Sequence, residues 1–197
     1  MDNNGIRRYR GRRVACGNRR GFWREYGYLF VTVAVMLVVF RVVLQLAWVP
    51  SGSMETTIPT RSLLVSLRVP YLVGDPQPER GDVITFWNED MGKLLVKRVI
   101  ALPGEELSFD GGFVYIDGER LDEPYLPEEG ITVSLNQKSF TVPQGCLFVM
   151  GDNRGNSDDS RYWEDPYVPL TEIRAKVLAV ISVHKENCWR GVRGIGG

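Results

Sequence analysis

The longest apolar run of the chain is YLFVTVAVMLVVFRVVLQLAWV, residues 28–49, and it contains one charged residue, Arg41. A helix that crosses the hydrocarbon core of a bilayer needs about 20 apolar residues. Aromatic residues lie at both ends of the run, as is typical of membrane interfaces. The pattern predicts a transmembrane helix, although a buried core helix would show the same run. It is too long for a cleavable signal peptide and lacks a small-x-small cleavage site, so we interpret it as an uncleaved anchor.

Beyond residue 49 the apolar positions form short runs, separated by turn residues such as those at 110–112 and 117–118. Such runs predict strands, here at residues 62–69, 82–87, 95–102, 107–109, 113–116, 138–142, 146–150 and 174–183. Short strands between dense turns favour an all-β domain, a barrel-like fold or a sandwich of antiparallel strands. We therefore expect an all-β catalytic domain that follows a single N-terminal transmembrane helix.

The same patterns divide the chain into four parts. We expect a basic cytoplasmic arm, a transmembrane anchor, an external β-rich domain and a disordered tail, at residues 1–27, 28–49, 50–190 and 191–197. Residues 121–130 contain two prolines and four acidic residues. We expect that segment to be a solvated loop.

The charge of the chain is balanced overall, with 24 basic and 24 acidic residues, but eight arginines lie within residues 1–27. A basic arm on an otherwise acidic chain indicates nucleic acid or a membrane surface as partner. The adjoining apolar run favours the lipid bilayer and argues against nucleic acid. Basic residues that flank a membrane span are usually found on its cytoplasmic side. We therefore expect a cytoplasmic N-terminus, with residues 50–197 on the outer face of the membrane.

The residue types that most often build enzyme sites are scarce. The single histidine, His184, ends the last predicted strand, and nothing around it suggests a catalytic triad. One histidine and three scattered cysteines offer no zinc-ligand spacing, so no metal site is expected. Cys146 and Cys188 could pair outside the membrane, but a buried free thiol at Cys146 fits its apolar strand better.

A serine nucleophile would then need another base, and lysine can serve only when it is neutral. Burial in apolar surroundings lowers the pKa of lysine. Five lysines follow the anchor, and Lys97 alone lies in an apolar strand, LLVKRVIAL. The spacing leaves two interpretations open, an edge-strand lysine that discourages aggregation and a desolvated base. For the base, we expect burial and the adjacent Arg98 to lower the pKa by roughly 2 units, although Arg98 points to the other face of the strand.

Four segments carry a specific resemblance: PSGSM (50–54), RGDVITFW (80–87), KRVIALPGE (97–105) and GDNRGNSDDSRYW (151–163). In this order, after a candidate membrane span, they resemble the bacterial type I signal peptidases, also called leader peptidases. The pattern departs from the family at two positions. Thr56 replaces a usual proline, and Gly155 stands where an aspartate is common. Neither departure touches a catalytic group.

The resemblance implies a role for each matched residue. Ser53 matches the nucleophile and Lys97 the general base, and the hydroxyl of Ser51 would form the oxyanion hole with the backbone N–H of Ser53. Ser157 matches the serine that orients the lysine amine. Supporting ion pairs would join Asp152 to Arg98 and Asp159 to Arg161. No cofactor is needed for this chemistry.

The position of Ser53 fits such an activity. Ser53 lies five residues after Trp48, hence no more than roughly 17 Å from the end of the anchor at about 3.3–3.6 Å per residue. The resemblance implies a peptidase of the bacterial cytoplasmic membrane that cleaves secretory preproteins after a small residue, at an A-x-A-like site. Two other interpretations remain, a Ser/Lys peptidase with a narrow substrate, such as a conjugation pilin, and a non-enzymatic anchored β-domain. A self-cleaving repressor is disfavoured because no helix-turn-helix region is present.

Overall fold

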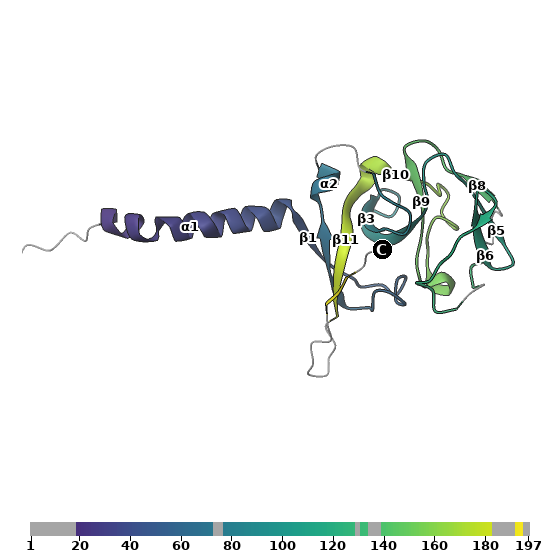
Figure 1. Ribbon diagram of the computed structural model, residues 1–197, viewed down its shortest axis with the longest axis horizontal. Helices are drawn as coiled ribbons and strands as arrows, with labels where there is room; N and C mark the ends of the chain where they lie inside the picture. Colours follow the sequence, from purple (N-terminus) through teal and green to yellow (C-terminus); the bar gives the residue numbers. More distant parts are fainter. Residues whose placement is uncertain (1–18, 73–76, 129–130, 134–138, 183–191, 195–197) are drawn as a thin grey trace, which may run out of the picture. The chain divides into compact units, whose positions relative to one another are not determined.

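The computed structural model describes residues 19–72, 77–128, 131–133, 139–182 and 192–194 (Figure 1). It contains two compact units, one that ends at Val38 and one that begins at Val39. His184, Cys16 and Cys188 lie outside the described residues, so the expectations placed on them are not tested.

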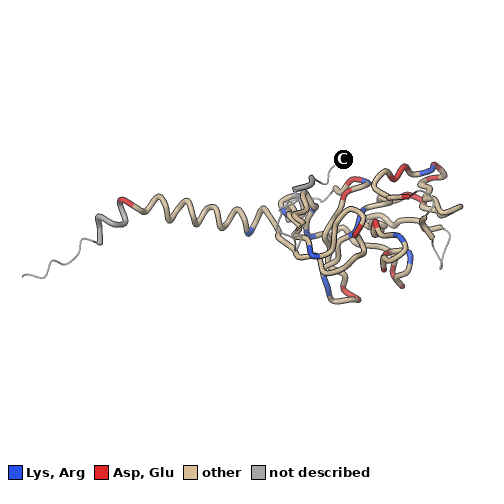
Figure 2. Tube along the Cα trace, turned by 90° about the horizontal axis from the view of Figure 1, so that it is seen from below, with Lys and Arg blue, Asp and Glu red and all other residues tan. Residues whose placement is uncertain are grey.

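Helix α1 spans Arg19–Val42. Its window Glu25–Val42 is long and apolar enough to cross a membrane by length and composition, and none of that window is buried. Figure 2 shows few charged residues along the helix and many over the β-rich unit. The helix ends seven residues before the expected end of the anchor, at Val42 in place of residue 49.

The last residues of the apolar run form a strand. Strand β1 (Leu44–Trp48) pairs antiparallel with β2 (Ser62–Leu67). In β1, Leu46 and Trp48 are more than half exposed, whereas the next residue, Val49, is buried. The expected 28–49 helix was wrong here because β2 supplies hydrogen-bond partners to this backbone, which a continuous apolar run does not reveal.

The first sheet has eight strands in the order β1-β2-β11-β3-β4-β9-β10, with β12 paired to β11. Its further members are β3 (Val83–Asn88), β4 (Lys93–Ala101), β9 (Cys146–Met150), β10 (Val168–Pro169), β11 (Ile173–Ser182) and β12 (Val192–Gly194). All its pairs are antiparallel. Strand β11 lies between β2 and β3, and its residues Val177 and Val180 pack in one core cluster with Met54 and Ile58.

The second sheet has four strands in the order β7-β6-β5-β8. They are β5 (Glu106–Asp110), β6 (Phe113–Ile116), β7 (Glu119–Arg120) and β8 (Ser139–Thr141). The β5–β6 connection places Gly111 and Gly112 at positive φ, 54° and 87°, a conformation that favours glycine. Leu107 of β5 and Phe140 of β8 are buried in one core cluster with Ile100 of β4 and Phe148 of β9. The second sheet thus lies beside the β4–β9 part of the first (Figure 1).

The prediction of an all-β domain after one N-terminal helix is confirmed. The strand predicted at 62–69 ends at Leu67, and the short helix α2 (Val69–Leu72) follows it. Residues 192–194 were expected in a disordered tail, but they form β12 on β11. Two short 3₁₀ turns, η1 (Arg154–Asn156) and η2 (Leu170–Glu172), complete the described elements.

Candidate active site

The segment with both candidate serines is a series of tight turns that starts directly after β1. Backbone hydrogen bonds between Val49 and both Ser62 and Arg61 close its two ends. Inside the segment, Met54 and Ile58 are buried in the core beside β2 and β11. These contacts fix a loop in which Ser51 is exposed and Ser53 is half-buried.

Lys97 lies on β4, opposite Ile84 of β3. Its side chain is only 2% exposed, and its Nζ donates a hydrogen bond to Ser157 Oγ over 2.8 Å. Burial lowers the pKa of Lys97 to about 8, against an upward contribution from Asp159 and Asp158. The edge-strand interpretation of this lysine is therefore wrong, because β4 lies between β3 and β9 and the amine is desolvated.

The cations that help to lower the pKa of Lys97 are Arg161 and Lys93. The expectation that Arg98 does so was wrong. Neighbours in a strand point to opposite faces, and Arg98 is engaged elsewhere. Its Nε and Nη2 donate to the two carboxylate oxygens of Asp152, over 2.8 and 2.6 Å.

Gly151 is the point where three of the motifs meet. A Cβ atom at this position would lie 2.1 Å from Ser157 Oγ and 2.5 Å from the carbonyl oxygen of Ser53. Real Cβ atoms essentially never come so close to another heavy atom, so only glycine fits. The lysine-bound hydroxyl and the backbone of the candidate nucleophile therefore pack against the same Cα atom.

The ion pair between Asp152 and Arg98 is also linked to the serine loop. Thr57 Oγ1 donates to Asp152 Oδ2 over 2.5 Å, and the N–H of Asp152 points to the sulfur of Met54. Asp152 is fully buried and Arg98 is 6% exposed. The hydrogen bond of Thr57 could not be predicted from the sequence, because its partner Asp152 lies 95 residues away.

The ion pair between Asp159 and Arg161 is buried on both sides. Two hydrogen bonds of 2.8 and 2.9 Å join the guanidinium to the carboxylate, and Gly151 N–H donates to Asp159 over 2.9 Å. Burial alone would raise the pKa of Asp159, but the bonds from Arg161 and Gly151 outweigh it and lower that pKa. Asp159 is thus an anion that holds the backbone of the Gly151 turn.

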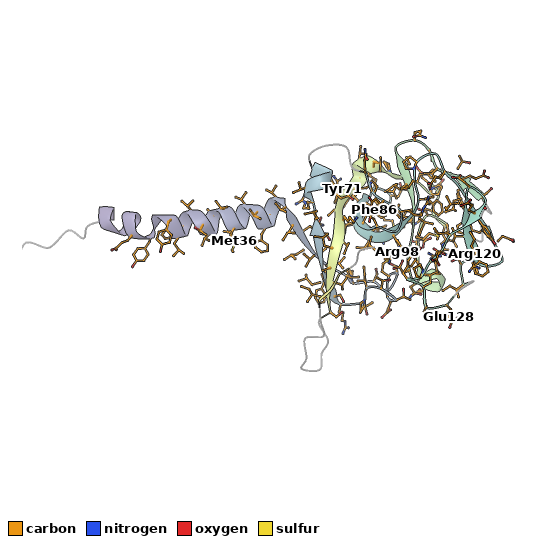
Figure 3. The ribbon with its side chains drawn as sticks, in the orientation of Figure 1. Met36, Tyr71, Phe86, Arg98, Arg120 and Glu128 are labelled. Carbon is orange, nitrogen blue, oxygen red and sulfur yellow. The ribbon has the colours of Figure 1, made fainter. Side chains whose placement is uncertain are left out.

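A second polar network lies under the loop that was expected to be solvated. Arg154 donates to both oxygens of Glu123 and to Thr132, and the hydroxyl of Tyr125 donates to Glu123. Figure 3 labels Arg98 within the β-rich unit. The Tyr125 ring centroid lies 3.9 Å from the guanidinium carbon of Arg98. Glu123 and Tyr125 therefore pack on Arg154 and Arg98, which composition alone did not indicate.

Ser53 and Lys97 are connected through Ser157 and Gly151 and not by a direct hydrogen bond. Among the described residues, no hydrogen bond joins Ser53 to Lys97, and Ser157 is the hydrogen-bond partner of the amine. No group of three His, Cys, Asp or Glu side chains in the described part could hold a metal ion. Cys146 is a free thiol as expected, but it is only partly buried.

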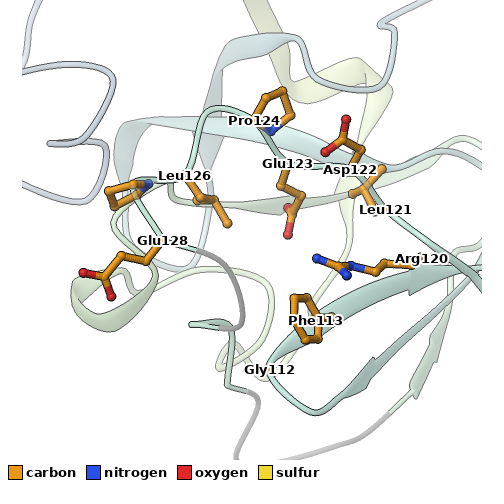
Figure 4. A pocket seen from close by; sticks show the side chains of 10 residues that line it. Gly112, Phe113, Arg120, Leu121, Asp122, Glu123, Pro124, Leu126 and Glu128 are labelled. Carbon is orange, nitrogen blue, oxygen red and sulfur yellow. The ribbon is translucent and has the colours of Figure 1, made fainter.

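A pocket of about 280 Å³ lies elsewhere, between Phe113 and the loop that follows β7 (Figure 4). Its lining includes Arg120, Glu123 and Glu128 and none of the residues that the resemblance assigns to catalysis. The buried amine and the serine loop, not this pocket, form the candidate active site.

The model of the family described as signal peptidase, peptidase S26, matches residues 23–182. A probable signal peptidase I-2 of Synechocystis sp. is 34% identical over 163 residues, 79% of this chain and 72% of its own. Signal peptidase I of Bacillus caldolyticus is 33% identical over 159 residues, 75% of this chain and 85% of its own. A crystal structure of a signal peptidase I from Enterococcus faecalis V583 covers 51% of this chain and 96% of its own at 36% identity, with a TM-score of 0.43. From the family match and the two sequence relatives, the chain belongs to the signal peptidase family, peptidase S26.

Proposed function

We propose that this chain is a membrane-anchored serine endopeptidase that removes signal peptides from exported preproteins, with Ser53 as nucleophile and Lys97 as general base. Membership of the family makes it a peptidase of this class. One observation supports the assignment of the base. The buried amine of Lys97, with its pKa near 8, donates a hydrogen bond to Ser157, which lies beside the Ser53 loop.

The proposed reaction starts with neutral Lys97. Its lone pair takes the proton of Ser53 Oγ while that oxygen forms a bond to the scissile carbonyl carbon. The resulting oxyanion is stabilised by Ser53 N–H and the hydroxyl of Ser51. Lys97 then passes the proton to the leaving amine as the peptide bond breaks. A water molecule then gives a proton to Lys97 and attacks the acyl carbon; the bond to Ser53 Oγ breaks, and Lys97 returns the proton to that oxygen.

The remaining groups hold this arrangement. Ser157 accepts a hydrogen bond from Lys97 and fixes where the amine can lie. The buried pairs of Arg98 with Asp152 and Arg161 with Asp159 support the two loops and take no part in proton transfer. We assign them a supporting role because each carboxylate already accepts hydrogen bonds from a guanidinium.

The substrate and the location follow from the same proposal. Helix α1 would anchor the chain in the bacterial cytoplasmic membrane, with the arginine-rich N-terminus in the cytoplasm and the β-rich unit on the outer face. A nucleophile a few residues beyond β1 would reach bonds near that face. There a signal peptide presents small residues at the first and third positions before the cut.

Cleavage of a purified preprotein by the full chain in detergent micelles tests the proposal. We expect Ser53→Ala to abolish cleavage while its far-UV spectrum and melting temperature stay close to those of the parent. Ser139→Ala is a matched control, because Ser139 is an exposed serine on β8. Parent-like cleavage by Ser53→Ala would refute the assignment of the nucleophile.

A further inference from the structure

Asn153 makes two hydrogen bonds to the backbone on either side of the candidate nucleophile. Its side-chain Nδ2 donates to the carbonyl oxygen of Gly52 over 2.9 Å. Its backbone N–H donates to the carbonyl oxygen of Ser53 over 3.0 Å. The Gly52 carbonyl also accepts the N–H of Glu55 over 3.1 Å. Both peptide groups that flank Ser53 are thus held by one residue of the loop after β9.

The bond to Gly52 bears on the oxyanion hole through the geometry of the peptide group. A peptide unit is planar, and in the trans form its C=O and N–H point in opposite directions. No cis peptide bond occurs among the described residues. The carbonyl of Gly52 and the N–H of Ser53 belong to one such unit. Fixing the carbonyl on Asn153 therefore fixes the direction in which the N–H of Ser53 points.

Asn153 is itself rigidly held. The preceding residue, Asp152, is fully buried and bonded to Arg98 and Thr57, and the carbonyl oxygen of Asn153 accepts the N–H of Asn156 over 3.0 Å. Because the backbone of Asn153 is fixed on both sides, its side-chain amide can hold another peptide group with little loss of conformational entropy.

We propose that Asn153 is a positioning residue that orients Ser53, and with it the N–H donor of the oxyanion hole, before substrate binds. The inference rests on the proposed function, since it assigns that N–H to the oxyanion. Asn153 acts on the side of the nucleophile, whereas Ser157 acts on the side of the base. Loss of Asn153 should therefore lower the rate of the chemical step and leave the titration of Lys97 in place.

Two variants of the full chain test this, Asn153→Ala and Asn153→Asp. Loss of one oxyanion donor lowers kcat by about 10²–10³-fold, and a donor that is present but untethered should lower it by roughly ten- to a hundred-fold. We expect KM to stay within about two-fold of the parent, because most substrate contacts remain. The midpoint of the pH profile of Asn153→Ala should not move. Asn153→Asp keeps the side-chain volume and lacks the N–H donor, so it gives the measurement if Asn153→Ala does not fold.

Asn88→Ala is the matched control. Asn88 also bonds a backbone group in a tight turn, the N–H of Met91 over 2.8 Å, but lies at the end of β3 away from Ser53. We expect it to lower the melting temperature about as much as Asn153→Ala and to keep the parent kcat. A folded Asn153 variant with parent kcat, or a loss of activity that only tracks the melting temperature, would overturn the role of Asn153. Failure of Ser53→Ala to abolish cleavage would instead overturn the proposed function.

Discussion

The Nζ atom of Lys97 lies 2.8 Å from the Oγ atom of Ser157, although 60 positions separate the two residues in sequence. Strand pairing brings these two side chains together. Arg98 of β4 is opposite Met150, the last residue of β9, so the loop that follows β9 turns over Lys97. The position of the amine is set by the pairing of two strands and by the turn at Gly151.

The first prediction concerns the pH dependence of cleavage. The pKa of Lys97 is about 8, and only the neutral amine can take a proton from Ser53. We expect kcat/KM to rise with pH, to be half-maximal near pH 8 and to level off about one unit above that. Lys97→Arg should be as inactive as Lys97→Ala, because a guanidinium does not deprotonate in this range. The measurement is the initial rate of preprotein cleavage across pH 6 to 10.

A histidine mechanism would give a different result. His184→Ala should retain nearly the parent rate at every pH. If it abolished cleavage while Lys97→Arg retained it, Ser/Lys chemistry would be excluded.

Burying an amine for catalysis should lower the stability of the fold. The pKa of Lys97 is depressed in the folded protein, so the unfolded chain binds more protons between about pH 8 and 10.5. Stability from this residue therefore rises with pH through that window and is lowest below it. We expect Lys97→Met to be inactive and more stable than the parent at pH 7 by roughly 1–3 kcal/mol. Urea unfolding at pH 7 and pH 10 measures this, and the difference should shrink at the higher pH.

Gly151 provides a steric test of the site. Gly151→Ala places a methyl group against Ser157 Oγ and the Ser53 carbonyl, so we expect both loops to shift and activity to fall at least a hundred-fold. Gly155→Ala is the matched control in the same loop, because a Cβ there meets nothing within 4 Å. Equal activities for the two variants, measured by preprotein cleavage, would show that contact at Gly151 is unimportant.

The buried pair of Asp159 and Arg161 should matter for stability as well as activity. Asp159→Ala would leave a guanidinium that is 1% exposed without its carboxylate, which costs about 3–5 kcal/mol. We expect a large drop in the free energy of unfolding together with lost cleavage. A variant as stable as the parent that had lost only the chemical step would point to a direct catalytic role for Asp159.

Membrane topology gives a further expectation. If the arginine-rich end is cytoplasmic, protease added to intact protoplasts should digest the β-rich unit. Protection of that unit until lysis would contradict the proposed orientation.

Much of the fold could be predicted because turns punctuate the sequence. The strands predicted at 113–116 and 146–150 coincide with β6 and β9, since glycines lie close to both ends of each run. Strand β1 was missed because its residues extend an apolar run that reads as helix. The period-two pattern of Leu44, Leu46 and Trp48 was the available signal, but only pairing with β2 decides between the two structures.

Without the family resemblance, the site could be predicted only where a residue type implies chemistry. A lysine in an apolar strand and two serines beside a glycine are visible in the sequence. The bonds of Thr57 and Asn153 are not, because each joins segments about a hundred residues apart through side chains that are common in turns. The same holds for Glu123, whose partner Arg154 lies 31 residues away.

The pairing of β1 with β2 makes the spacing between Leu44 and Ser53 independent of the length of α1. Residues gained or lost within α1 would change the reach of the helix, which could adapt to bilayers of different thickness, without altering the spacing between Leu44 and Ser53. A single residue gained or lost inside β1 would turn its side chains to the opposite face of the sheet. Natural variation in length is therefore expected to accumulate before Leu44 and to be rare between Leu44 and Ser53.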